Sequence, residues 1–425
     1  MKKSLIFAAV AAVALSACAK IETNYKASAP EALTFGVYAG NAANTKAASA
    51  TDYGTVDNNI LGDASKNGFG VFGYYTDDAD YTHGTKANFM YNQQVKGNGD
   101  GSSPATAWTY SPVKYWPNEH GASASSGTHV DKLTFLAYAP FVENLQIGTD
   151  KGVTIKDNQA TAAAATEGIT AMTANDVAGD ATLTFVVPAS TAEQIDLLYG
   201  TLGAKSVNVD GTEEGTVGGP IENLTKEKTG GKINILFKHA LAKIAIDIKD
   251  VVDKVDPESL VNPASDGTKV VVESLTLKGT IGTSGKLNLY TGLWSDTAAG
   301  TSFAVSPLPA EIYAAAPTTY PGINGVVETG LANTIDLMVV PATGAEISGV
   351  EITYYICTED SQLDGGVSIV KNVISKDLAS AVAIEKGKQY GLNVLLGLTS
   401  IKLVATVDPW VVESTTAVDL PKNVE

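Results

Sequence analysis

The sequence predicts an all-β protein, on three observations. Apolar and polar residues alternate with a period of two along much of the chain, which is the pattern of half-buried strands. Clusters of Gly, Asn, Asp and Pro separate these stretches and favour turns, whereas helical stripes are few and short. The 425 residues include 41 glycines and only 4 methionines, which suits strands joined by turns.

The chain begins with a segment that predicts export. Two lysines at positions 2 and 3 precede an apolar run over residues 5–15, and Leu-Ser-Ala then stands directly before Cys18. This order is typical of a lipoprotein signal peptide over residues 1–17, which is too short to span a bilayer. We expect Cys18 to become the first residue of the mature chain and to carry lipid such as palmitate. The alternative is an ordinary secretory peptide with an incidental cysteine.

Strand candidates follow in order along the mature chain. Glycine-rich, polar loops separate them, and the loop over residues 211–220 precedes a new run of strands. We therefore expect two domains, residues 47–225 and 226–425, after an N-terminal segment of residues 18–46. The strand candidates are 33–37, 70–74, 133–138, 182–187, 232–237, 242–248, 270–277, 335–340, 351–356 and 390–407.

Three stretches carry a finer expectation. Over residues 232–248 the apolar residues shift from odd to even positions, which predicts a bulge or bend near His239. A similar shift at residues 399–400 predicts one long strand over 390–407 that passes from one sheet of a sandwich to the other. The glycine-rich residues 279–286 lack the spacing of a phosphate loop, and we interpret them as a hairpin or loop between strands.

Composition argues against several functional classes. A formal charge of -17 disfavours nucleic acid as a partner, because a polyanion would be repelled. With Cys18 lipidated, Cys357 is the remaining thiol, and its place within a strand pattern predicts a buried, inert side chain. The 4 histidines stand apart, and no zinc motif or nucleophile elbow is present. We expect no metal, no cofactor and no enzymatic activity.

An aromatic cluster extends from Trp108 to Pro117. Trp108, Tyr110 and Pro112 share one face by alternation, which favours a place in the core. The alternative is an exposed platform on which sugar rings stack.

Motifs along most of the mature chain resemble the fimbrillin family of type V pilins, the surface lipoproteins of the major and minor fimbrium type. Each motif is short, and the resemblance rests on their order in an all-β chain. The motifs are the lipobox before Cys18, the segment 108–117 (WTYSPVKYWP), 133–140 (LTFLAYAP), 196–200 (DLLYG), 237–244 (FKHALAKI), and 390–398 (YGLNVLLGL) leading to 407–410 (VDPW).

The resemblance implies two tandem transthyretin-like β-sandwich domains, export to the cell surface as an outer membrane lipoprotein, and polymerisation by donor-strand exchange. In that family a maturation protease removes the lipidated segment with its first strand, and the C-terminal segment of another subunit fills the groove. An extracellular fimbrium that supports adhesion or biofilm formation results. Its partners are other pilin subunits, the outer membrane through the lipid on Cys18, the protease, and host or bacterial surface ligands.

This sequence contains counterparts of those parts. The strand at 33–37 can be the removable one, and the polar stretch that follows suits cleavage between Lys46 and Ala47. The family's cut follows an arginine, whereas all 29 basic residues here are lysines, so the identity of the protease stays open. Residues 411–425 are long enough to be the donor strand. Its candidate inserting residues are Val411, Val418 and Leu420, and Pro421 limits regular pairing.

The expected function is thus a structural subunit of a cell-surface fimbrium. The alternatives are a pilus anchor or tip accessory protein, or a surface glycan-binding lipoprotein. Thr297, in Asp-Thr-Ala, fits a short pattern for O-glycosylation in bacteria that export such proteins. The stalk, tip or anchor position and the adhesion target stay open.

Overall fold

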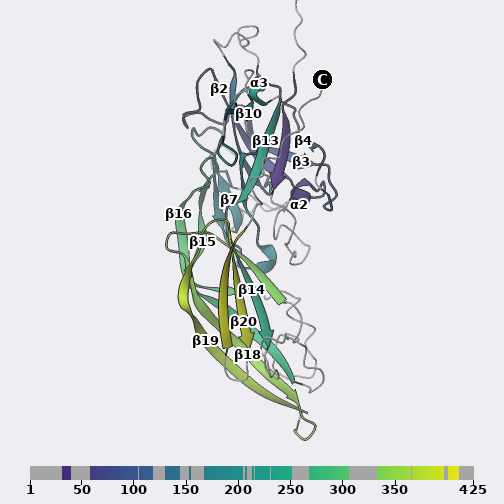
Figure 1. The fold of residues 1–425 in the computed structure, drawn as a ribbon, viewed down its shortest axis with the longest axis vertical. Helices are drawn as coiled ribbons and strands as arrows, with labels where there is room; N and C mark the ends of the chain where they lie inside the picture. Colours follow the sequence, from purple (N-terminus) through teal and green to yellow (C-terminus); the bar gives the residue numbers. More distant parts are fainter. Residues whose placement is uncertain are drawn as a thin grey trace, which may run out of the picture.

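Strands dominate the computed structural model, which confirms the all-β prediction. The helices α2 (Asn58–Gly62) and α3 (Lys226–Thr229) and the 3-10 helix η2 (Thr191–Glu193) are single turns. Figure 1 shows an elongated molecule with strands such as β13 at one end and β18 to β20 at the other. The structure describes residues 31–39, 58–103, 105–117, 130–143, 153–154, 167–203, 206–207, 213–214, 216–229, 231–250, 268–305, 333–364, 366–396 and 401–410.

The N-terminal end is built on an eight-stranded sheet. The first two strands of this sheet pair in parallel, while its other pairs are antiparallel. In spatial order the strands are β1 (Thr34–Ala39), β13 (Lys232–His239), β9 (Leu198–Leu202), β5 (Lys132–Ala139), β2 (Phe69–Asp77), β3 (Met90–Gly97) and β4 (Trp108–Thr109), and β12 (Ile221–Leu224) pairs with β5.

Both faces of this sheet are covered. On β2, Phe72 and Tyr74 belong to one core cluster, whereas Phe69 and Val71 belong to another on the opposite face. A strand buried on both faces lacks regular polar positions, so β2 and β5 read as almost continuous apolar runs. The second of these clusters, between the sheet and the aromatic segment at Trp108, contains the side chains of β1.

A second sheet of seven strands links the two halves of the chain. The 21-residue strand β15 pairs along its first part with β18 and at its end with β8. In spatial order the strands of this seven-stranded sheet are β19 (Val367–Ala383), β18 (Glu346–Glu359), β15 (Thr268–Asn288), β8 (Thr182–Val186), β7 (Gly168–Met172) and β6 (Val153–Thr154). The remaining strand, β16 (Trp294–Val305), pairs with β15.

A four-stranded sheet packs with this second sheet through the larger core. Ile246 and Leu392 of the four-stranded sheet share that core with Leu277 and Ile352 of the seven-stranded one. The strands of the smaller sheet, in order, are β17 (Asn333–Val339), β14 (Ala242–Asp250), β20 (Lys388–Leu396) and β21 (Ile401–Pro409). Two short strands, β10 (Ser206–Val207) and β11 (Glu213–Glu214), pair separately.

The predicted bend near His239 is confirmed. Strand β13 ends there, β14 begins at Ala242, and the intervening Ala240 and Leu241 are fully buried. At this bend the chain passes from the eight-stranded sheet to the four-stranded one. The division between residues 225 and 226 stays a prediction, and β13, which follows it, lies in the sheet of the N-terminal half.

Two expectations about long strands were wrong. Residues 390–407 form two antiparallel neighbours, β20 and β21, within one sheet, with Leu396 opposite Ile401. The shift in the apolar pattern therefore marks a reversal of the chain. Residues 279–286 lie inside β15 and form no loop. A Cβ atom on Gly279 or Gly282 would collide with a backbone carbonyl of a neighbouring segment, so these glycines permit close approach of the backbone.

Candidate functional site: the seat of strand β1

Strand β1 lies at the edge of the eight-stranded sheet (Figure 1). It pairs in parallel with β13, so that Phe35 stands opposite Ile233 and Val37 opposite Ile235. Parallel pairing is slightly less stable per residue than antiparallel pairing. We call the position that residues 33–39 occupy the β1 seat.

The side chains of β1 alternate as the sequence predicts. Leu33 and Phe35 are only 1% and 3% exposed, and Val37 is partly buried against the same cluster. The face of the strand that alternation assigns to Leu33, Phe35 and Val37 therefore lies in the N-terminal core, with Val37 at its margin. Burial of one large apolar side chain stabilises by about 1.5–3 kcal/mol, so removal of β1 would leave apolar surface uncovered.

The ring of Phe35 lies among three other rings. Its centroid is 6.0 Å from that of Phe69, 5.5 Å from that of Tyr110 and 6.1 Å from that of Phe135. All three pairs are edge-on, with interplanar angles of 88°, 69° and 89°, an arrangement that aromatic quadrupoles favour. We call the walls formed by Phe69, Tyr110 and Phe135 the Phe35 pocket.

The start of β1 is held on its second side by the aromatic segment. The backbone N–H of Leu33 donates to the carbonyl of Lys114 at 2.9 Å, and that of Trp116 donates to Glu31 at 3.1 Å. The hydroxyl of Tyr110 donates to the carbonyl of Leu33 at 2.8 Å. Burial raises the pKa of Tyr110, and its hydroxyl is a neutral donor at physiological pH even without this shift. The N-terminal part of the seat is therefore closed on both sides.

The core interpretation of the aromatic cluster agrees with these contacts. Trp116 is 6% exposed, and its indole N–H donates to the carbonyl of Gly231 at 3.1 Å. Trp108 and Tyr110 are partly buried against the same cluster as Leu33. The rings of the segment thus mostly cover the seat, although Tyr115 is 49% exposed. The expectation that Pro112 shares the core face was wrong, because this residue is exposed.

The other residues predicted to take part in the fimbrial mechanism lie outside the described part of the chain. The predictions of lipidation, cleavage and strand donation therefore stay predictions. These residues are Cys18, Lys46, Ala47, Val411, Val418 and Leu420.

Trp410, the last residue that the structure describes, directly precedes the candidate donor segment. Trp410 follows β21, is 5% exposed and donates its backbone N–H to Gly387 at 3.0 Å. Its indole stacks on the imidazole of His239, with centroids 3.9 Å apart and an interplanar angle of 9°. His239 in turn contacts the carboxylate of Asp196 at 3.0 Å. These residues belong to separate sequence motifs, and no local signal predicted that they meet.

Thr297 lies in β16, with its side chain partly buried. The neighbouring Asp296 has a φ of 48° and pairs with Lys286 at 2.8 Å, at a point where the β15–β16 register shifts. O-glycosylation of Thr297 stays a prediction, which peptide mapping of the native protein can check.

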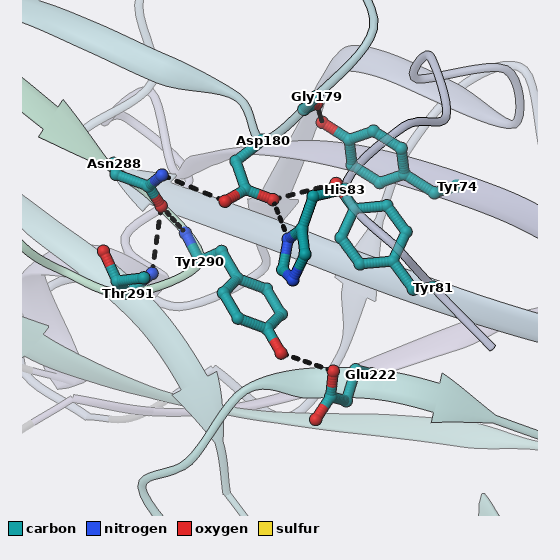
Figure 2. A network of polar contacts seen from close by, with 9 residues as sticks. All are labelled: Tyr74, Tyr81, His83, Gly179, Asp180, Glu222, Asn288, Tyr290 and Thr291. Atoms are coloured by element: carbon teal, nitrogen blue, oxygen red, sulfur yellow. Dashed lines mark hydrogen bonds and ion pairs between the residues drawn. The ribbon is translucent and has the colours of Figure 1, made fainter.

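A network of hydrogen bonds links loops of the N-terminal half to the turn between β15 and β16. Figure 2 shows Asp180 at its centre, where its carboxylate accepts from Tyr81 at 3.0 Å and from Asn288 at 3.0 Å and contacts His83 at 2.8 Å. Burial raises the pKa of Tyr81, so that its hydroxyl stays protonated and donates. These contacts assign a structural role to the network.

Other chemistry finds little support in the part of the chain that the structure describes. No group of three His, Cys, Asp or Glu side chains there could hold a metal ion. No helix among these residues is long and apolar enough to cross a membrane. Cys357 lies in β18, is fully buried and free, and burial raises the pKa of its thiol.

Comparison with known proteins points to fimbriae. The model of a family described as fimbrillin-like matches residues 55–410. Fimbrium subunit Fim1C of Phocaeicola vulgatus is 29% identical over 215 residues, which are 49% of this chain and 41% of that protein. The alignment thus spans less than half of the relative's length. The crystal structure of a fimbrial protein from Bacteroides vulgatus is similar in fold, with 20% identity and a TM-score of 0.57 over 90% of this chain and 100% of that one.

Proposed function

The chain belongs to the fimbrillin-like family of fimbrial subunits, and we propose that it is a structural subunit of a cell-surface fimbrium that polymerises by strand exchange at the β1 seat. The observation that carries this proposal is the placement of β1. The first described strand of the chain fills an edge position of a sheet and inserts Leu33 and Phe35 into a core otherwise built from later residues.

The physical reason for exchange is the state of the seat without β1. Strand β13 would present unpaired N–H and C=O groups along residues 232–237, which now pair with β1. The apolar slot of Leu33 and Phe35 would be open to water at the same time. An incoming strand that pairs with β13 and fills the slot removes both penalties, which is the logic of β-augmentation.

We propose residues 411–425 as the strand that this subunit donates. Trp410 supports this assignment, because its burial and its stacking on His239 fix the point from which the segment leaves. Val411, Val418 and Leu420 are the proposed inserting side chains. Val418 and Leu420 share one face of a strand by alternation, and Val411 joins that face only if the strand has a bulge between them. The proposed cut between Lys46 and Ala47 would release β1.

Deletion of residues 411–425 tests the proposal. The truncated chain should fold and carry lipid, because Trp410 and all residues before it are retained. It should not form the SDS-resistant ladders of fimbrial polymers, because the proposed donor strand is missing. Circular dichroism and thermal unfolding of the truncated chain control for folding. A normal ladder from the folded truncation would contradict strand donation by this segment.

We further propose that the lipid on Cys18 holds the precursor at the outer membrane. The complete lipobox supports this, and the family places the protein at the cell surface. Replacement of Cys18 by Ala should abolish metabolic labelling with palmitate, and persistent labelling would contradict the assignment. An anchor subunit that keeps its lipid and β1 remains the alternative within the family.

We propose a structural role in preference to catalysis or glycan binding. Membership of a family of fimbrial subunits supports the structural role. A glycan platform in the segment Trp108 to Pro117 would need exposed rings, whereas Trp116 is buried and Tyr110 packs on Phe35.

A further inference from the structure

The Phe35 pocket belongs to a larger aromatic cluster. Phe69, one wall of the pocket, also lies 5.3 Å from the ring of Trp108 and 5.3 Å from that of Phe237. Phe135, another wall, lies 6.5 Å from Phe89. The ring of Phe35 therefore completes a set of edge-on and tilted ring contacts that extends across the sheet.

The walls of the pocket are poorly able to close over an empty space. Phe69 and Phe135 are fully buried and belong to β2 and β5, which pair with each other inside the sheet. Close-packed cores relax only partly when a side chain is removed, so a smaller side chain leaves a cavity. A strand without a ring at this position would also lose aromatic pair contacts, each worth about 0.5–1.5 kcal/mol beyond the buried area.

Residues 411–425 cannot supply a ring. They contain no Phe, Tyr or Trp, and Leu420 is their largest aliphatic side chain. Whatever the direction or register of pairing, this segment can place no more than an aliphatic side chain in the pocket. A junction between two copies of this chain made with these residues would therefore leave the pocket underfilled.

We propose that the Phe35 pocket selects the incoming strand, and that its preferred donor is a strand of a different subunit with an aromatic side chain at the position of Phe35. The inference rests on the strand exchange proposed above and adds the chemistry of the partner. Phenylalanine fits better than tyrosine, because the side chains of Phe69 and Phe135 offer carbon atoms only. The hydroxyl of the third wall, Tyr110, already bonds to the backbone of Leu33 and Lys114, and a buried hydroxyl without a partner is destabilising. A junction that uses residues 411–425 of a second copy is then disfavoured at this seat.

A displacement assay on the full mature chain tests the inference. A specific protease site is placed between Lys46 and Ala47, and a fluorophore is attached to Cys18 of the non-lipidated chain, since Cys357 is fully buried. After cleavage, the labelled fragment of residues 18–46 stays bound through β1. Its release by added peptides is followed by fluorescence anisotropy.

The assay compares peptides of residues 411–425 that differ by single substitutions to phenylalanine. One has the sequence of residues 411–425, two carry Val418→Phe or Leu420→Phe, and one carries Asp419→Phe as the matched control. Alternation places residue 419 on the opposite face of a strand from 418 and 420, so its ring adds bulk but points away from the pocket. A peptide of residues 31–39 is the reference for exchange.

We expect one of the two ring variants at 418 and 420 to release the label at a concentration lower by about tenfold than the unmodified peptide. The Asp419→Phe peptide should match the unmodified one. Equal potency of all four tail peptides, or an equal gain from Asp419→Phe, would overturn aromatic selection while exchange by the 31–39 peptide still stands. Failure of every peptide, including 31–39, would overturn exchange at this seat and the inference with it.

Discussion

Phe35 is the side chain through which β1 contributes most to the core. It is 3% exposed and touches rings from β2, β5 and the aromatic segment. Leu33 anchors the strand beside it, and Val37 lies at the margin. The packing of the Phe35 ring is therefore a large part of what stabilises β1 in its position.

Replacement of Phe35 by Ala should lower the free energy of unfolding of the N-terminal sheet by about 3–5 kcal/mol, because the pocket cannot collapse around the missing ring. Denaturation followed together with hydrogen exchange of the β13 amides would measure this, and exchange should accelerate along residues 232–237. Val373→Ala is the control, since Val373 is 63% exposed and its loss should change stability by less than about 0.5 kcal/mol. Unchanged protection of β13 in Phe35→Ala would contradict the role assigned to the ring.

The alternation of residues 33–37 was enough to predict which side chains of β1 face inward. It could not predict that Phe35 meets Phe69 and Phe135, because contacts between distant strands leave no trace in local periodicity. The stacking of Trp410 on His239 escaped prediction for the same reason.

Some of the strands with one or two buried faces were predictable, whereas β3, β7 and β9 were missed although they carry buried residues. The apolar runs of β2 and β5 and the alternation of β13 are local consequences of burial, and they were recognised. Strands β16 and β19 were missed because most of their side chains are exposed and polar or small. The expectation of one strand over residues 390–407 was wrong, because a shift of phase looks the same in a bulged strand and in two antiparallel neighbours such as β20 and β21.

An ion pair between two strands of the four-stranded sheet predicts that the stability of a variant depends on pH. Lys243 of β14 and Asp336 of β17 form an ion pair at 2.9 Å, with side chains only 5% and 12% exposed. Burial raises the pKa of Asp336, and the charge of Lys243 partly offsets this. Replacement of Lys243 by Met should raise that pKa further and destabilise the protein by about 3–5 kcal/mol at pH 7, because it leaves a buried carboxylate unpaired.

The loss of stability caused by Lys243→Met should become smaller as the pH is lowered. A raised pKa in the folded state means that the folded chain binds a proton more readily than the unfolded chain, so stability falls as pH rises from the ordinary carboxyl pKa through the raised one. Denaturation of Lys243→Met at pH 7 and near pH 5 measures this. Lys286→Met, which breaks an exposed pair with Asp296, is the matched control and should show a much smaller loss at either pH. A loss independent of pH would contradict the account.

In the whole molecule, strand β13 connects the β1 seat, where a strand would be received, with the point where the proposed donor segment begins. Strand β13 pairs with β1 along residues 232–237, and His239 at its end stacks on Trp410, where the proposed donor segment begins. In the proposed fimbrium, the strand received from one neighbour and the strand given to the next would both attach to β13 or its end. Tension along the filament would then pass through this strand.

The architecture at this scale was the least accessible to local patterns. The family resemblance implied an all-β pilin, and the all-β class is confirmed. The order of strands in each sheet, the parallel pairing of β1 and the passage of β15 from one half to the other depend on contacts between distant residues. Neither composition nor periodicity encodes such contacts.

The proposed exchange requires that β1 leave its own subunit when the fimbrium forms. Mass spectrometry of the N-terminus of chains in native surface filaments, separated from cell-bound precursor, tests this. Polymerised chains should begin at Ala47 and lack residues 33–39, while the precursor should begin at a lipidated Cys18. Filaments whose chains still begin at Cys18 and retain residues 33–39 would contradict it.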